Sequence, residues 1–268
     1  MKEGGLAEVV ASISARSRLR TWSVIITFLG DAIVPRGGAV SARTVQEVLA
    51  CLSIEPGRLR TAFSRLTKDD WLIRERVGRA SYYRLSPSGL APFARATTQI
   101  YAAGQPSPTT GQAWLLGLSD NGPDRISLRP DTPEHRDDLA GTETFLMSGT
   151  VEHLPEWLKN HFAEEHLRLG FENLLKDFAP LDIRALSDIE AMAARCLLIH
   201  EWRRLRLRAP ELPPQFLPND WPMEACLDFV AQTYHQLLPA SERWLDDHAT
   251  GPQGSLRPAV ESVARRFR

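Results

Sequence analysis

Six polar side chains within one short segment point to nucleic-acid binding. Four of them recur at intervals of three and four residues, so they share one face of a helix, and the other two flank that face. The four are Arg58, Thr61, Arg65 and Lys68, and the flanking pair is Arg60 and Ser64. Arginine reads guanine through two hydrogen bonds in the major groove, whereas hydroxyl groups and lysine bind phosphate. The pattern predicts a helix that contacts double-stranded DNA, although an isolated helix of this kind is more often an ordinary solvated face.

The opposite face of this helix is apolar and is expected to be buried. It consists of Leu59, Ala62, Phe63 and Leu66. Ser53 is expected to cap the helix, and Pro56 is tolerated in the first turn, where its missing N–H would have had no intrahelical partner. The predicted helix therefore runs from just after Ser53 to about Lys68.

Two more helices are expected before this one. Residues 22–33 follow the amphipathic pattern of apolar residues at i, i+3, i+4 and i+7, and Pro35 with Gly37 and Gly38 ends that helix. Ser41 is a suitable N-cap for the second helix. Because few residues separate the second and third helices, the three together predict a helix-turn-helix.

After Leu72 the apolar period changes to alternation, which predicts a β-hairpin. Residues 73–77 and 81–85 would be its strands, with a turn at residues 78–80. The hairpin carries Arg74, Arg76 and Arg79, so it is expected to act as a wing that contacts phosphate or the minor groove. The other interpretation is an exposed hairpin whose charges serve solubility.

The rest of the chain predicts a small mixed unit followed by helices. A helix is expected over residues 86–101, a linker over 104–111, strands over 113–118, 124–130 and 144–149, and helices over 154–178, 186–208 and 223–238. The fold class is therefore α+β. We expect a DNA-binding domain in residues 1–103, a central α+β domain for dimerisation and sensing in residues 112–180, and a helical C-terminal domain in residues 181–268.

Composition and charge agree with a globular, DNA-binding protein. The 268 residues are 43% hydrophobic and 24% charged, with no apolar run long enough for a membrane span or a secretory signal, so a cytoplasmic location is expected. Residues 16–84 hold thirteen Arg or Lys against six Asp or Glu, a net charge of +7, whereas residues 85–268 hold eighteen against twenty-five, a net charge of −7. A cationic segment on an acidic body favours a nucleic-acid partner. Cys51, Cys196 and Cys226 are expected to be buried thiols.

Several longer motifs resemble the phenylacetate-degradation repressors of the PaaX type. At the N-terminal end they are TWSVIITFLGDAIVPRGG at residues 21–38, RTAFSRL at 60–66 and DWL at 70–72. Towards the C-terminal end they are LIHEWRR at residues 198–204 and LPNDWP at 217–222. The resemblance implies a winged helix, a central ferredoxin-like unit related to the Cas2 fold, and a helical C-terminal domain. It also implies repression of an aromatic-acid catabolic operon that is relieved by phenylacetyl-coenzyme A, without a cofactor.

The middle of the chain departs from the family pattern. Between Leu118 and His153 the sequence is shorter than the family usually is, and the expected helix leading into a Gly-aromatic strand is not found. The identity of the effector is therefore less firmly implied than DNA binding.

A coenzyme A thioester needs cations for its phosphates and an apolar pocket for its acyl group. Trp202, Arg203, Arg204 and Trp221 could supply both, so these four are the predicted effector-binding residues. The alternative is that the arginines meet the dipole at the end of a helix and the tryptophans belong to the core.

No enzymatic site is expected. The sequence has no G-x-S-x-G motif, no Gly-rich phosphate loop and no paired cysteines, and His161 and His166 are five residues apart, which does not suit a metal site on one helical face. A homodimer is inferred because one recognition helix reads too few base pairs for useful specificity. The alternatives are a Cas2-like, metal-dependent nuclease that uses Asp120, and an architectural DNA-binding protein without an effector.

Overall fold

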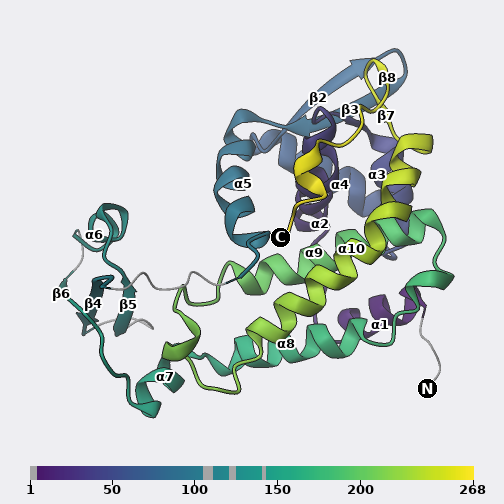
Figure 1. Cartoon of the computed structure of the whole chain (residues 1–268). Coiled ribbons are helices and arrows are strands. Elements are labelled where there is room, and N and C mark those ends of the chain that lie inside the picture. Colours follow the sequence, from purple (N-terminus) through teal and green to yellow (C-terminus); the bar gives the residue numbers. More distant parts are fainter. Residues whose placement is uncertain (1–4, 105–110, 121–124, 141–142) are drawn as a thin grey trace. The chain divides into compact units, whose positions relative to one another are not determined.

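The computed structural model describes residues 5–104, 111–120, 125–140 and 143–268, and it is an α+β protein (Figure 1). The chain divides into two compact units. The first comprises Met1–Ala103, Phe171–Leu207 and Ala225–Arg268, and the second comprises Gly104–Gly170 and Arg208–Glu224. This division differs from the three domains that the sequence predicts, because most of the C-terminal helical residues group with the N-terminal ones. Residues 105–110 of the predicted linker lie outside the described residues.

Helix α2, Thr21–Phe28, is buried on nearly every side at the centre of the first unit. Its side chains from Ser23 to Phe28 are all buried, whereas Trp22, the first residue of the predicted amphipathic pattern, is exposed. The helix continues as a π-helical turn, Leu29–Ile33, and a short 3-10 turn, Val34–Arg36, before Gly37 adopts a left-handed conformation. Only glycine adopts that conformation without strain, which explains why the helix ends there.

Helix α9, Asp188–Arg206, packs against α2 and is likewise buried around most of its circumference. A capping box starts it, because the side chains of Ser187 and Glu190 each bind the backbone N–H of the other residue. Helix α10, Met223–His248, is ten residues longer than the predicted helix. It continues past Pro239, since the buried Trp244 and Leu245 give the last turns tertiary contacts that offset the hydrogen bond lost at proline. Helix α1, Leu6–Arg16, completes the unit and is not predicted from the sequence.

A small antiparallel sheet lies next to these helices, in the strand order β1-β3-β2. Strand β1 is Val40–Ser41, and the hairpin consists of β2, Leu72–Val77, and β3, Ala80–Leu85. Helix α5, Pro87–Ile100, follows directly and is capped by Ser86, whose hydroxyl accepts a hydrogen bond from the N–H of Gly89. The predicted hairpin and the predicted helix after it are thus both confirmed.

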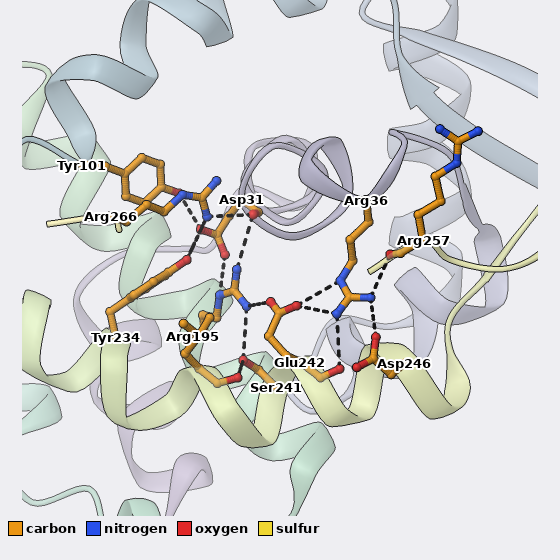
Figure 2. Close-up of polar contacts among 11 residues, drawn as sticks. Asp31, Arg36, Tyr101, Arg195, Tyr234, Ser241, Glu242, Asp246, Arg257 and Arg266 are labelled. Carbon is orange, nitrogen blue, oxygen red and sulfur yellow. Dashed lines mark hydrogen bonds and ion pairs between the residues drawn. The ribbon is translucent and has the colours of Figure 1, made fainter. Parts of the chain in front are cut away.

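A network of charged side chains inside the first unit ties the turn after α2 to α9, α10 and the C-terminal segment (Figure 2). Asp31 forms ion pairs of 2.7 Å with both Arg195 and Arg266, and Arg195 pairs with Glu242 of α10 at 2.5 Å. Glu242 also binds Arg36, which follows the π-helical turn. Asp31 and Arg195 have almost no exposed surface. Opposite charges therefore satisfy one another where water does not reach.

The second unit is built around a three-stranded antiparallel sheet. Its strands are β4, Trp114–Ser119, β5, Ile126–Pro130, and β6, Thr144–Gly149, in the order β5-β4-β6, with α6, Pro133–Ala140, between β5 and β6. Trp114 and Leu128 pack in a core with Leu212 and Phe216. All three predicted strands are confirmed. The ferredoxin-like, Cas2-like arrangement stays a prediction.

Two features of the helical regions differ from the sequence-based predictions. Helix α6, before strand β6, is not predicted from the sequence. The predicted helix over residues 154–178 is divided into α7, Glu156–Phe162, and α8, Glu165–Phe178, because the chain leaves the helical conformation at Ala163. In the described part of the chain no helix is both long and apolar enough to cross a membrane.

Candidate nucleic-acid interface

Two helices joined by a short turn form the scaffold of the candidate interface. Helix α3, Ala42–Ala50, begins at Ser41, whose hydroxyl accepts a hydrogen bond from the N–H of Thr44, as predicted. Helix α4 is Pro56–Lys68 and begins after Glu55, not after Ser53. Ser53 instead lies in the turn with a φ of 57°. Its neighbours Leu52 and Ile54 are both buried, so the chain bends at Ser53 to bring both side chains inward and the helix starts later.

The face of α4 that points away from the core is polar and exposed. Leu59, Ala62, Phe63 and Leu66 are buried, as the apolar period predicts. The exposed residues line one shallow depression together with Asp69; they are Arg60, Thr61, Ser64, Arg65 and Lys68. Arg65 and Asp69 form an ion pair of 3.4 Å, but the Arg65 side chain keeps 73% of its surface exposed. Five of the six predicted residues on this helix are therefore accessible on one surface.

Arg58 is the sixth predicted residue, and it lies at the edge of this face. Its side chain is half-buried, and its Nη2 donates a hydrogen bond of 3.2 Å to the carbonyl oxygen of Leu19. Leu19 belongs to the segment between α1 and α2, so Arg58 joins that segment to the first turn of α4. The sequence pattern does not indicate this contact, because the two residues are far apart in the chain.

The hairpin packs against α4 and carries basic residues beside it. The ring of Tyr83 stacks on that of Phe63, with ring centroids 3.9 Å apart. Strand pairing places Arg74 opposite Tyr83 and Arg76 opposite Ser81, so both arginines lie on the same face of the hairpin as Tyr83. Arg79 is exposed in the two-residue turn, where Gly78 has a φ of 60°. The predicted residues Arg76 and Arg79 are therefore accessible on the element that packs beside α4.

Two of the four predicted effector-binding residues, Trp202 and Arg203, make contacts inside the first unit. Trp202 has no exposed surface, and its Nε1 donates a hydrogen bond of 2.8 Å to the carbonyl oxygen of Ile100. Arg203 donates to the hydroxyls of Thr27 and Ser23, and its burial lowers its pKa. Trp202 therefore belongs to the core, because the helix that carries it is buried around most of its circumference.

The other two predicted effector residues belong to different units: Arg204 to the first and Trp221 to the second. Arg204 is partly exposed and pairs with Glu201 at 3.2 Å. Trp221 belongs to the second unit, where Arg168 lies over its ring and also binds Asp220. A pocket formed by all four residues stays a prediction.

Comparisons with known proteins agree on one family. The sequence pattern of the family described as PaaX-like protein matches residues 20–89, and that of the PaaX-like protein C-terminal domain matches residues 162–247. The chain is also 27% identical over 288 residues to the transcriptional repressor PaaX of Escherichia coli strain K12, covering 91% of this chain and 89% of that one. The chain belongs to the PaaX-like family. The resemblance read from the sequence motifs is thus confirmed.

In this PaaX-like protein the two matched regions coincide with helical parts of the fold. The first covers α2, α3, α4 and the hairpin, and it ends in the first turn of α5. The second covers all of α8 and α9 and nearly all of α10. The sheet β5-β4-β6 falls between them, in the region where the sequence departs from the family pattern.

The first unit of the PaaX-like protein also contains a cavity of about 440 Å³ that the sequence does not reveal. Its lining comes from the turn after α2, from α5 and from the C-terminal segment. Gly30, Phe93 and Val260 supply apolar surface, and Arg257 and Arg266 supply positive charge. Arg266 is held by Asp31, but Arg257 has no ion pair among the described residues. The cavity therefore combines apolar walls with a cation.

The chemistry that a metal-dependent nuclease needs is not assembled in the described part of this PaaX-like protein. Asp120 is exposed just after strand β4. Within residues 5–104, 111–120, 125–140 and 143–268, no group of three or more His, Cys, Asp or Glu side chains is placed to hold a metal ion. Cys196 and Cys226 are buried and Cys51 is half-buried, and burial raises the pKa of all three thiols.

Proposed function

We propose that this PaaX-like protein is a transcriptional repressor that binds operator DNA through α4 and the hairpin β2–β3. In this proposal the first unit contains a winged helix-turn-helix, with α4 in the major groove and the hairpin as the wing. The main observation behind this proposal is that five polar side chains of α4, three of them cationic, form one accessible face. The name of the E. coli relative supports the proposal, since that protein is a transcriptional repressor.

The positive charge of the N-terminal segment and the width of α4 together favour double-stranded DNA as the ligand. Residues 16–84 carry a net charge of +7 within a protein of net charge −1. Helix α4 is thirteen residues long and presents Arg60, Arg65 and Lys68 on a side with no apolar residue. A helix of this width fits the major groove, where arginine can read guanine and lysine can bind phosphate.

The test is binding of the full-length protein to the duplex upstream of its own operon. Arg65→Ala is expected to weaken binding about 10- to 100-fold, because a base contact contributes roughly 1–3 kcal/mol. Lys68→Ala is expected to lower the slope of log K against log salt by about 1, as the loss of one phosphate contact does. Affinity measured by fluorescence anisotropy at several salt concentrations gives both quantities.

A matched control removes exposed cations elsewhere in the same unit. Arg243 and Arg265 pair with Asp188 and Glu261 on the surface, so the variant Arg243→Ala/Arg265→Ala loses two charges without touching α4. Equal losses of affinity in the control and in Arg65→Ala would overturn the assignment of α4. DNA that is cut on incubation with Mg²⁺ or Mn²⁺ would instead support the nuclease alternative.

We also propose that a coenzyme A thioester of an aryl acid, with phenylacetyl-coenzyme A as first choice, releases the repressor from DNA, and that the repressor acts as a homodimer. The cavity beside Phe93 and Arg257 supports the first part, because it pairs apolar walls with a cation and touches the turn that follows α2. Titrating phenylacetyl-coenzyme A into the protein–DNA complex tests this. Retention of the complex at saturating thioester, with no thermal shift of the free protein, would leave an architectural DNA-binding protein as the better description.

A further inference from the structure

The segment between α1 and α2 carries two arginines that the candidate interface does not yet use. Arg18 and Arg20 flank Leu19, which is 6% exposed and therefore faces the core. Ser17 and Arg20 both have extended backbone conformations, in which successive side chains point to opposite sides. Arg18 and Arg20 accordingly point outward and are exposed. Among the described residues, neither guanidinium forms an ion pair or a hydrogen bond.

Both ends of this segment are fixed to the body of the first unit. Arg16 and Ser12, at the end of α1, both bind the carboxylate of Asp177 in α8. At the other end, the carbonyl oxygen of Leu19 accepts the hydrogen bond from Arg58. The backbone between these anchors is short, so Arg18 and Arg20 project from a held position and not from a loose loop.

The second anchor also determines where the two arginines lie. Arg58 is the third residue of α4, so the segment sits beside the N-terminal turn of that helix. In helix-turn-helix proteins this end of the recognition helix contacts the base edges. A cationic group next to it meets the phosphates that border the same stretch of major groove.

We propose that Arg18 and Arg20 form a separate phosphate-binding site that holds the DNA backbone beside the N-terminal end of α4. The proposal rests on the proposed function, since it needs α4 to lie in the major groove. It gives a ligand of opposite charge to two exposed guanidinium groups that have no acidic partner among the described residues. The ligand is the sugar–phosphate backbone of duplex DNA, so the contact carries no base preference of its own.

The experiment compares three full-length double variants, with Arg65→Ala as the reference for α4, on one operator duplex and one unrelated duplex, in fluorescence anisotropy at several salt concentrations. Arg18→Ala/Arg20→Ala removes both charges and is expected to lower the salt slope by about 2. It is also expected to weaken binding to both duplexes by about 10- to 100-fold. Arg18→Lys/Arg20→Lys keeps the charges and should restore the slope and most of the affinity. Arg243→Ala/Arg265→Ala should leave both quantities unchanged.

The outcomes separate this site from the function on which it rests. If neither the wild-type protein nor any variant binds DNA, the proposed function fails. If Arg65→Ala loses operator affinity while Arg18→Ala/Arg20→Ala keeps the wild-type affinity and slope, the phosphate site alone is overturned. It is also overturned if the double alanine variant loses affinity without a change of slope, or if the lysine variant does not recover, because a structural defect would then explain the loss. Thermal unfolding of each variant checks that the fold is intact.

Discussion

At the scale of single residues, Asp31 is a buried carboxylate that forms ion pairs with two arginines. Burial alone would raise the pKa of its carboxyl group, but Arg195 and Arg266 outweigh burial and lower the pKa below its usual value. The carboxylate also accepts hydrogen bonds from Tyr101 and Tyr234, and Tyr234 has its pKa raised by burial to about 12. Because the pKa of Asp31 is lowered, its stabilising contribution is present above about pH 4 and is lost only as the pH falls through the lowered value.

Asp31→Asn should therefore destabilise the protein strongly at neutral pH. The substitution leaves Arg195 and Arg266 buried without their shared counter-charge, and breaking a buried pair in this way costs about 3–5 kcal/mol. The matched control is Asp246→Asn, whose carboxylate is 55% exposed where it pairs with Arg36, so about 1 kcal/mol or less is expected. Urea unfolding gives both values, and similar losses in the two variants would contradict the central role of Asp31.

A second prediction at this scale concerns His200. Burial, followed by the charges of Arg203 and Arg204, holds the pKa of this histidine well below its usual value. Its Nδ1 lies 3.2 Å from Thr27 Oγ1, and Glu201 is 3.9 Å from its Nε2. The folded protein keeps His200 neutral, whereas the unfolded chain takes up a proton below about pH 6.5. Stability should therefore fall as the pH drops from about 7 to 5, with a slope of up to about 1.4 kcal/mol per pH unit from this residue.

Replacing His200 shows how much of the pH dependence of the unfolding free energy comes from this residue. His200→Gln should flatten the pH dependence of unfolding free energy between about pH 5 and 7, even if the variant is less stable throughout. His166→Gln serves as the control, because the His166 side chain is 62% exposed and its loss should leave the slope as it is. A wild-type slope retained in His200→Gln would assign the proton uptake to another group.

At the scale of elements, helix α5 is held against the turn after α2 by a close contact at Gly30. A Cβ atom on Gly30 would overlap the ring of Phe93. Gly30→Ala is expected to cost about 1–3 kcal/mol, the usual range for overpacking, and to cost less in a Phe93→Leu background. Gly57→Ala in α4 is the control, since a Cβ there meets nothing within 4 Å. Thermal unfolding of the four proteins in the Gly30–Phe93 cycle measures the coupling, and additive losses would contradict it.

Elements set by local interactions agree with the sequence-based predictions. The start of α3 at Ser41 and the hairpin with its turn at Gly78 follow from a capping hydroxyl and from two short strand-like segments around a glycine turn, both readable within a few residues. The start of α4 is predicted wrongly, because the bend at Ser53 depends on the burial of Leu52 and Ile54 against distant parts of the chain. Burial by tertiary contacts is not visible in a local pattern.

In the candidate site, too, the sequence predicts what depends on local pattern and misses what depends on tertiary contacts. The exposed face of α4 follows from helical periodicity, so five of its six predicted residues are accessible. The contact of Arg58 with Leu19, the burial of Trp202 and the position of Arg18 beside α4 all depend on residues that are distant in sequence. Asp31 and Arg195 look like ordinary surface charges in the sequence, and only their pairing across the core reveals their role.

At the scale of the whole molecule, the proposed function requires two copies of α4 on one operator. A helix of thirteen residues reaches few base pairs, so a single chain would discriminate poorly among genomic sites. A dimer that places one α4 in each of two major grooves on the same side of the duplex needs half-sites separated by about 10–10.5 base pairs or a multiple. We therefore expect two chains per operator and a strict dependence on half-site spacing.

Operators of altered spacing test this requirement directly. Inserting about 5 base pairs between the half-sites puts them on opposite sides of the duplex, so affinity should fall towards that of a single half-site. Inserting about 10 base pairs returns them to one side, and affinity should recover in part, because the dimer then has to span a longer distance. Sedimentation of the protein–DNA complex gives the stoichiometry. One chain per duplex, together with an affinity that ignores both insertions, would mean that a single chain recognises the operator, and the homodimer would have to be abandoned.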